Sequence, residues 1–257
     1  MSNQSKHIPD KLDISHIVSG TYAKPAQITS DIALKAEHIT KTFDSIAGRV
    51  EALKDINLTI KKGEFVSIMG PSGSGKSVLL NILGALDRPT SGKIFINGLD
   101  IFSLGDMEIA TMRNLLIGYI FQSYNLVNRT TVQANVKLPA IIAGVSASEA
   151  NYRSMKILEH LGIVDKAKQK PTNLSGGQQQ RVAIARCLIN NPAIILADEP
   201  TGNLDTKTGE DIFAMLNELS RKFKRTILMV THNPELAELT DRTIFIKDGR
   251  IDKEITN

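Results

Sequence analysis

The sequence contains a single cysteine, Cys187, among its 257 residues. One thiol excludes an internal disulfide bond and a zinc site built from cysteines, and it is compatible with a reducing cytosol. The sequence also lacks any apolar run near the roughly 18–20 residues that are needed to cross a bilayer. Residues 1–10 are polar and lack the apolar core of a secretory signal. We therefore expect the chain to stay in the cytosol and to be held at any membrane by another protein.

The composition is that of an ordinary globular protein, with 42% hydrophobic and 23% charged residues. The length suits one large domain, or one domain with an inserted subdomain. The net charge of +4 comes from basic residues that are scattered along the chain. The densest basic cluster, at residues 221–225, follows a predicted helix end, where a solvated surface explains it more simply than a nucleic-acid site. Charge alone therefore assigns no partner.

The order of the predicted elements indicates an α/β fold that is interrupted by a helical segment. Residues 1–33 have no sustained helical or strand period and are predicted to be a flexible extension. Residues 105–169 carry helical periodicity with few strand signals. Strands and helices alternate elsewhere, which predicts a mainly parallel sheet with helices on both faces. The predicted strands are residues 33–39, 56–60, 64–69, 93–96, 194–198, 226–231 and 243–247, the predicted helices include residues 77–86, 148–161, 181–188 and 210–221, and Asn97 with Gly98 is a predicted hairpin turn.

A complete phosphate-binding motif, GPSGSGKS, follows the predicted strand at residues 64–69 and precedes a predicted helix. Its glycines allow a tight fold in which successive N–H groups converge on a phosphate, and the helix start adds its positive dipole end. Lys76 is predicted to contact the β- and γ-phosphates, and the Ser77 hydroxyl is predicted to ligate Mg²⁺. The motif indicates a nucleoside triphosphate and says nothing about what its energy drives. The eight residues of this loop are Gly70, Pro71, Ser72, Gly73, Ser74, Gly75, Lys76 and Ser77.

The apolar run at residues 194–197 ends in two acids, Asp198 and Glu199. A buried parallel strand presents its carboxyl end to the ligand crevice. We expect Asp198 to face the metal ion through a water molecule, and Glu199 to accept a proton from the water that attacks the γ-phosphate. Two acids at a strand end are also compatible with plain exposure to solvent, and it is the phosphate-binding loop that favours catalysis.

A second Gly-rich helix start, LSGGQ, occupies residues 174–178. Ser175 is a good residue to cap a helix, the two glycines expose backbone N–H groups, and the helix directs its positive dipole end outward. The chain therefore has a second anion site, well separated from the first. One nucleotide has no obvious use for both.

The string LSGGQ, with QQRVAIAR directly after it, resembles the signature of ABC ATPases, and the resemblance covers residues 34–252. It implies a P-loop NTPase core of the RecA-like type, with a mainly parallel sheet, a small antiparallel β part and a helical subdomain inserted at about residues 105–180. In this family two ATPase subunits form a head-to-tail homodimer, in which the signature of each closes over the ATP of the other. Ser175, Gly177 and Gln178 would then complete the partner's site, and residues 253–257 would form a tail.

Further residues match family positions in the expected order. Gln122 matches the glutamine that ligates Mg²⁺ and senses the membrane partner. His232 matches the histidine that contacts the γ-phosphate, and Leu204 with Asp205 matches the loop that crosses the dimer interface. The resemblance therefore implies an ATPase in which Lys76, Glu199 and His232 take part in catalysis.

Two positions depart from the common pattern of the family. Phe43 takes the place of the aromatic residue, more often tyrosine, that stacks on adenine, and it keeps the stacking face while losing the hydroxyl. Val78 replaces a common threonine, and its backbone N–H remains available to phosphate. ATP binding is expected to survive both changes.

Three strings, FQSYNL at residues 121–126, ADEPTGNLD at 197–205 and LGALD at 83–87, make the resemblance closest to the lipoprotein-releasing and macrolide-exporting group. Members of this group pair with permeases that have large extracytoplasmic domains. The resemblance implies an ATPase that works on the inner face of the cell membrane through such a permease. The cargo would contact the permease, so this chain does not identify it.

Two alternatives remain open at this point. One is an ABC ATPase that acts on DNA or ribosomes, but such proteins carry long coiled-coil or zinc-bearing insertions, or two cassettes, and this chain has one cassette with a short helical insertion. The other is a binding module that no longer hydrolyses ATP, although every catalytic position is filled. Transport is therefore the favoured function, with no nucleic acid expected as a partner.

Overall fold

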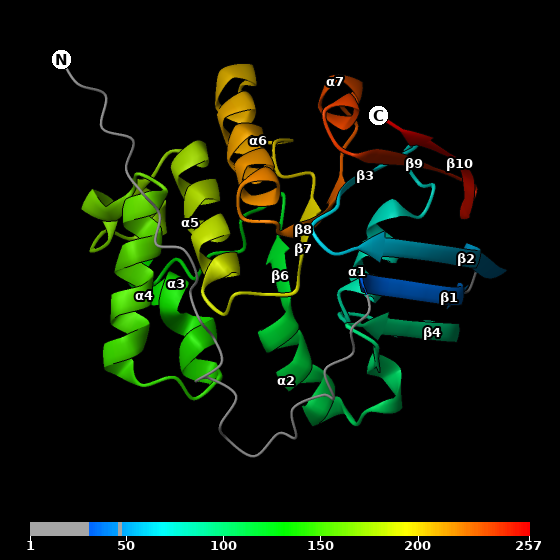
Figure 1. Cartoon of the computed structure of the whole chain (residues 1–257), viewed down its shortest axis with the longest axis horizontal. Coiled ribbons are helices and arrows are strands. Elements are labelled where there is room, and N and C mark those ends of the chain that lie inside the picture. The colour runs from blue at the N-terminus through cyan, green and yellow to red at the C-terminus, as the bar shows by residue number, and fades with distance from the viewer. Residues whose placement is uncertain (1–30, 46–47) are drawn as a thin grey trace.

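The computed structural model describes residues 31–45 and 48–257, which form two sheets and the helices that cover them (Figure 1). Residues 1–30 of the predicted extension lie outside the described residues. Strand pairing begins at Ile32, whereas the extension was predicted to reach residue 33. The strands are β1 (Ile32–Ser45), β2 (Gly48–Lys61), β3 (Phe65–Met69), β4 (Ser91–Ile96), β5 (Leu99–Asp100), β6 (Ile117–Ile120), β7 (Ile194–Asp198), β8 (Thr226–Val230), β9 (Arg242–Lys247) and β10 (Arg250–Thr256). The α-helices are α1 (Lys76–Leu83), α2 (Asp106–Leu116), α3 (Val132–Ile142), α4 (Ala147–His160), α5 (Gly176–Leu188), α6 (Thr206–Arg221) and α7 (Pro234–Glu238).

A six-stranded sheet in the order β10-β9-β3-β8-β7-β6 forms the centre of the molecule. All neighbouring strands in it are parallel except β10, which pairs antiparallel with β9. Its central strands are buried on both faces, as β7 shows: Ile194 and Leu196 pack into one core, and Ile195 and Ala197 pack into the other. Both faces of β7 pack into apolar cores, which is why residues 194–197 form an uninterrupted apolar run.

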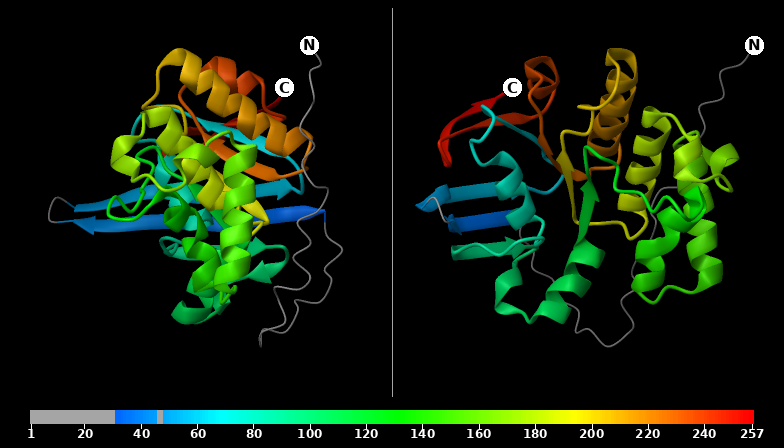
Figure 2. Two further views of the ribbon diagram at one scale, coloured as in Figure 1. Left: turned by 90° about the vertical axis from the view of Figure 1, so that its left-hand side faces the viewer. Right: turned by 180° about the vertical axis from the view of Figure 1, so that it is seen from behind.

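The molecule is layered around this sheet (Figures 1 and 2). An antiparallel sheet, in the order β2-β1-β4-β5, lies on one side and shares its core with α1. Helices α5 and α6, with the helical subdomain built from α3 and α4, pack on the other side. The expected mainly parallel sheet, small antiparallel part and helical insertion are thereby confirmed.

The antiparallel sheet confirms the predicted hairpin turn and lengthens two predicted strands. Asn97 and Gly98 have φ angles of 47° and 80°, the paired left-handed geometry of a tight two-residue hairpin between β4 and β5. Strands β1 and β2 pair from Ile32 opposite Lys61 to Ser45 opposite Gly48, well beyond the predicted 33–39 and 56–60. Several register shifts interrupt this pairing, and each shift breaks the alternation of apolar and polar residues on which sequence recognition depends.

The start of the helical subdomain and the C-terminal tail differ from expectation. Strand β6 lies inside the segment that was predicted to have few strands, and it pairs in parallel with β7 at the edge of the central sheet. Helix α2 precedes it and packs through Ile109 into the core that contains α1. The helical subdomain therefore begins after β6 and not near residue 105. Strand β10 takes up most of the predicted tail at 253–257, because its backbone pairs with β9.

Cys187 is a buried core residue, as expected. Burial raises the pKa of its thiol to about 12, so the sulfur stays protonated at neutral pH. Its Sγ occupies the space that a Cβ at Gly118 of β6 would need. In the described part of the chain, no helix combines the length and the apolar character required to cross a membrane.

Candidate active site

The phosphate-binding loop joins the end of β3 to the start of α1. Gly70 and Gly75 have φ angles of 152° and 102°, which favour glycine. A Cβ at Gly75 would lie 2.6 Å from the Ala52 carbonyl oxygen of β2, so the loop packs closely against that strand. The Ser74 hydroxyl is buried in the loop without a hydrogen-bond partner among the described residues. The loop is therefore a tight turn whose backbone is directed to a ligand site.

Lys76 and Ser77 lie at the start of α1. The Lys76 Nζ donates to the carbonyl oxygens of Gly70 and Pro71, at 2.9 and 2.8 Å, so the ammonium lies against the loop. The Ser77 Oγ lies 3.5 Å from the Asp198 Oδ1 at the end of β7. A hydroxyl and a carboxylate are oxygen ligands of the kind that Mg²⁺ takes from a protein when phosphate and water supply the rest. These residues fit a nucleoside triphosphate with its magnesium ion.

Asp198 is a half-buried carboxyl group at the carboxyl end of β7. Burial raises its pKa, and the neighbouring charge of Glu199 raises it further. A hydrogen bond from Ser77 and the charge of Lys76 act in the opposite direction. The net effect is a raised pKa for the Asp198 carboxyl group.

The raised pKa predicts that Asp198→Asn stabilises the nucleotide-free protein. A carboxyl group with a raised pKa is protonated more readily in the folded state, so its cost to stability is present above both pKa values and fades as the pH falls through the folded pKa. We expect Asp198→Asn to raise Tm at about pH 8, and the gain to shrink towards about pH 4. Thermal unfolding across this range is the measurement, with Asp252→Asn on the exposed part of β10 as the control. An equal gain in the control, or a gain that does not depend on pH, would contradict this explanation.

Glu199 follows Asp198 in a strained position. Its φ of 44° is left-handed, which costs a non-glycine residue on the order of 1–2 kcal/mol. Its N–H donates to the Val230 carbonyl oxygen of β8, and its carbonyl oxygen accepts from the Gly202 N–H, each at 3.0 Å. The His232 Nδ1, after β8, lies 3.3 Å from the Glu199 Oε2. The backbone strain thus directs a carboxylate towards a histidine, and such strain is common at active sites.

Gln122 reaches the same place from the end of β6. A Cβ at Gly202 would lie 2.9 Å from the Gln122 Nε2 and 3.1 Å from the Glu199 Oε2, so both side chains converge on this glycine. The Asn203 Nδ2 also donates to the Gln122 carbonyl oxygen at 3.0 Å. Sequence reasoning assigned no role to Gly202 and Asn203, although both lie in the string at 197–205 that supported the family resemblance.

The signature residues form a second cluster. Ser175 caps α5, with its Oγ accepting from the Gln178 N–H at 3.3 Å while the Gln178 Oε1 accepts from the Ser175 N–H at 3.0 Å, which confirms the predicted cap. Gly177 packs directly against Thr208 of α6. The Asp205 Oδ1 accepts from the Thr208 N–H at 3.0 Å, and this bond lowers the pKa of Asp205. Among the described residues, no hydrogen bond or ion pair connects this cluster to residues 70–77.

The two residues that depart from the family pattern lie on β1 and on α1. Phe43 lies on β1 opposite Val50, is 43% exposed, and has the Lys41 Nζ 5.0 Å from its ring centroid. Strand β2 brings this hairpin next to the loop through the Gly75 contact with Ala52. The Val78 side chain packs against the core, which leaves its backbone on the side of the loop.

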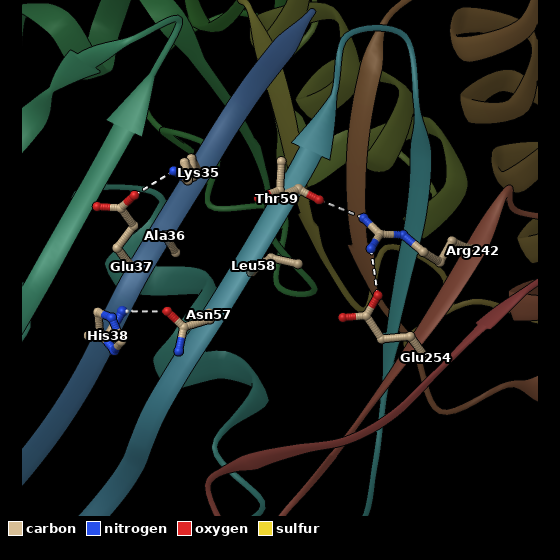
Figure 3. Close-up of a pocket in the computed structure, with 9 residues that line it drawn as sticks. All are labelled: Lys35, Ala36, Glu37, His38, Asn57, Leu58, Thr59, Arg242 and Glu254. Atoms are coloured by element: carbon tan, nitrogen blue, oxygen red, sulfur yellow. Dashed lines mark hydrogen bonds and ion pairs between the residues drawn. The ribbon is translucent and has the colours of Figure 1, made fainter.

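A groove of about 580 Å³ lies elsewhere, between the antiparallel sheet and the β9–β10 hairpin (Figure 3). Arg242 bridges it by donating to the Thr59 carbonyl oxygen at 2.7 Å and to Glu254 at 2.6 Å, and it also pairs with Glu64. Lys35 pairs with Glu37 along the same wall. These charges are satisfied by one another, and none of the predicted site residues lines this groove.

The sequence model described as ABC transporter matches residues 53–202, which is more than half of the chain. The chain belongs to the ABC transporter family. Lipoprotein-releasing system ATP-binding protein LolD from Bacteroides thetaiotaomicron is 48% identical over 221 residues, which cover 86% of this chain and all of that protein. Macrolide export ATP-binding/permease protein MacB from Vibrio parahaemolyticus is 47% identical over 228 residues, but this chain covers only 35% of its length.

Solved structures agree with this assignment. The dimeric structure of the ABC transporter cassette MJ0796, a protein of Methanocaldococcus jannaschii, has a TM-score of 0.81 and 46% identity, over 87% of this chain and 98% of that one. A second structure of that cassette shows a dimeric post-hydrolysis state bound to ADP and phosphate. The predicted family, P-loop fold and function are confirmed: this ABC transporter chain is an ATP-binding and ATP-hydrolysing subunit. Its relatives do not favour the alternative of a nucleic-acid or ribosome ATPase.

Proposed function

We propose that two copies of this ABC transporter subunit bind ATP between them, head to tail, and that their closure drives a separate membrane permease. One observation carries the proposal: each chain has two helix starts suited to phosphate, one at residues 70–77 and one at Ser175, and each belongs to a different cluster. A nucleotide on the loop of one copy can reach Ser175, Gly177 and Gln178 only on a second copy. The dimeric cassette structure of the relative supports this arrangement.

The converging residues suggest a division of labour in hydrolysis. Bound Mg²⁺ would neutralise phosphate charge, held by Ser77 and Gln122 directly and by Asp198 through a water molecule. Lys76 would exchange its two loop carbonyls for phosphate oxygens. The Glu199 carboxylate would orient the attacking water and take its proton. His232, which lies beside the Glu199 carboxylate, would contact the γ-phosphate. Phe43 would stack on adenine, and Asp205 would contact the partner subunit.

Sedimentation of a hydrolysis-blocked variant tests the head-to-tail dimer. Glu199→Gln loaded with Mg-ATP is expected to sediment as a dimer and to return to a monomer when nucleotide is removed. Ser175→Arg in the same background is the control, because a long cationic side chain at the signature blocks closure while residues 70–77 stay intact. A Glu199→Gln protein that stays monomeric with Mg-ATP, even together with its membrane partner, would overturn the proposal.

The partner is proposed to be a permease with a large extracytoplasmic domain, which places this subunit on the inner face of the membrane. The support is the similarity to LolD and to MacB, a protein whose name joins an ATP-binding part to a permease. The helical subdomain offers a surface for it. Leu138, Ile141 and Ile142 are 41%, 45% and 67% exposed, and their spacing places them on one face of α3. Clustered apolar side chains on a surface indicate a protein contact more strongly than single ones do.

Ile142→Lys is expected to separate the subunit from its permease without affecting the nucleotide site. A buried charge at an apolar contact should lower the amount of subunit that sediments with membranes of its source cells by about tenfold. The ATPase rate of the purified variant should match the parent, because Ile142 lies outside both clusters. Leu239→Lys, at an apolar residue of similar exposure after α7, is the control. Equal membrane sedimentation of both variants would rule out α3 as the docking surface.

A further inference from the structure

Arg186, near the end of α5, holds two consecutive backbone carbonyls of the segment that follows Gln122. Its Nη1 donates to the Asn125 carbonyl oxygen at 2.5 Å, and its Nη2 donates to the Tyr124 carbonyl oxygen at 2.9 Å. A guanidinium is a rigid fork, so two donors that engage adjacent acceptors fix the direction of the backbone as well as its position. The helix that begins at the signature therefore ends in a clamp on this segment.

The clamped turn is strained. Tyr124 and Asn125 have φ angles of 60° and 49°, both left-handed. Left-handed backbone is unfavourable for a bulky residue such as Tyr124, although asparagine adopts it more readily, and at Tyr124 it is kept by the surrounding contacts. The Tyr124 side chain also lies over the start of α5, where its hydroxyl would be 2.8 Å from a Cβ at Gly176. Helix α5 thus contacts this turn near both of its ends.

The clamp uses a partly buried cation, for which no acidic partner lies within residues 31–45 and 48–257. Desolvation lowers the pKa of the Arg186 guanidinium, and within residues 31–45 and 48–257 no ion pair to it is found. Burying a charge without a counter-charge is costly unless hydrogen bonds compensate for it. Among the described residues, the guanidinium donates its hydrogen bonds to the Tyr124 and Asn125 carbonyl oxygens. Arg186 therefore fixes the position of this backbone and forms no ion pair there.

We propose that Arg186 is a positioning residue for Gln122. By holding the carbonyl groups of Tyr124 and Asn125, it places the Gln122 side chain at the metal site. The proposal rests on the proposed role of Gln122 as a Mg²⁺ ligand. Gln122 has a second anchor, because its own carbonyl oxygen accepts from Asn203 beside the catalytic carboxylate. Its backbone is therefore held on one side by the loop after Glu199 and on the other by the signature helix. A shift of α5 moves the metal ligand of the same subunit.

The Mg²⁺ dependence of the ATPase rate tests this role. Arg186→Lys keeps the positive charge but loses the two-pronged guanidinium. We expect it to raise the Mg²⁺ concentration that gives a half-maximal rate about tenfold, because losing a residue that orients a metal ligand typically weakens metal binding by that amount. Arg181→Lys is the matched control: Arg181 lies on the same helix and donates to the Leu161 carbonyl oxygen, away from the site. The control should leave the Mg²⁺ dependence unchanged. ATP binding without Mg²⁺ should be unchanged in both variants.

A double-mutant cycle separates positioning from a general effect on stability. If Arg186 acts through Gln122, Arg186→Lys adds nothing to the Mg²⁺ dependence of Gln122→Ala. An unchanged Mg²⁺ dependence in Arg186→Lys, a fall in Tm alone, or full additivity with Gln122→Ala would overturn the inference while leaving the role of Gln122 intact. An unchanged Mg²⁺ dependence in Gln122→Ala itself would instead overturn the proposed role of Gln122, and the inference with it.

Discussion

Glu199→Gln is expected to lower the rate of ATP hydrolysis about 10³-fold while ATP binding is retained, a rise of about 4 kcal/mol in the barrier. The amide keeps the size of the side chain and removes its ability to accept a proton from the attacking water. Glu199 has a left-handed backbone, and its Oε2 lies 3.3 Å from the His232 Nδ1, so the carboxylate faces the other residues of the proposed site.

Single-turnover hydrolysis and a separate nucleotide-binding titration measure the two halves of this prediction. Glu210→Gln is the control, because Glu210 is an exposed carboxylate on α6. We expect Glu210→Gln to hydrolyse ATP at the rate of the unsubstituted protein. Near-normal turnover by purified Glu199→Gln would refute the assignment of Glu199 as the base, and the role would have to pass to another group.

Lys76→Met is expected to weaken the binding of Mg-ATP about a hundredfold, with little loss of stability. A charge-assisted contact to phosphate contributes up to about 3 kcal/mol, which corresponds to about two decades in Kd. Within residues 31–45 and 48–257 the ammonium bonds only to the Gly70 and Pro71 carbonyl oxygens, at the half-exposed surface of the loop, so its removal should change Tm little.

Calorimetric titration with Mg-ATP, together with thermal unfolding, checks both parts. Lys62→Met, at an exposed lysine before β3, is the control for the loss of one positive charge from the chain. Lys76→Arg provides a sharper comparison: it keeps the charge, and the larger planar group should still bind ATP poorly in so tight a loop. Near-parent affinity in Lys76→Met would remove the lysine from the phosphate site.

The site motifs were recognisable in the sequence because their physical demands are local. A loop that directs backbone N–H groups at a phosphate needs several glycines within a few residues, and residues 70–77 supply three of them in one uninterrupted string. The capping box of Ser175 with Gln178 involves residues only three apart, and the predicted cap was confirmed. The apolar run before Asp198 was equally visible, because both faces of β7 pack into apolar cores.

Short edge elements were not recognisable in the same way. Strand β6 has four residues and β10 is largely exposed, so neither shows a clear period, and each exists because its backbone pairs with a neighbour. The helical subdomain was placed too early for this reason. The lengths of β1 and β2 were underestimated because bulges in their pairing disrupt the alternation of side chains.

The sequence by itself determined the chemistry of this ABC transporter subunit: the loop at 70–77, the acids Asp198 and Glu199, and the signature start at Ser175, each a contiguous string with its own local geometry. Only the tertiary structure decided how these strings meet. It brings Gln122 and Glu199 together at Gly202, leaves the signature in a separate cluster beside Thr208, and fastens Arg186 to the turn after Gln122. Contacts between residues far apart in the chain depend on the packing of whole elements, and no single segment encodes that packing.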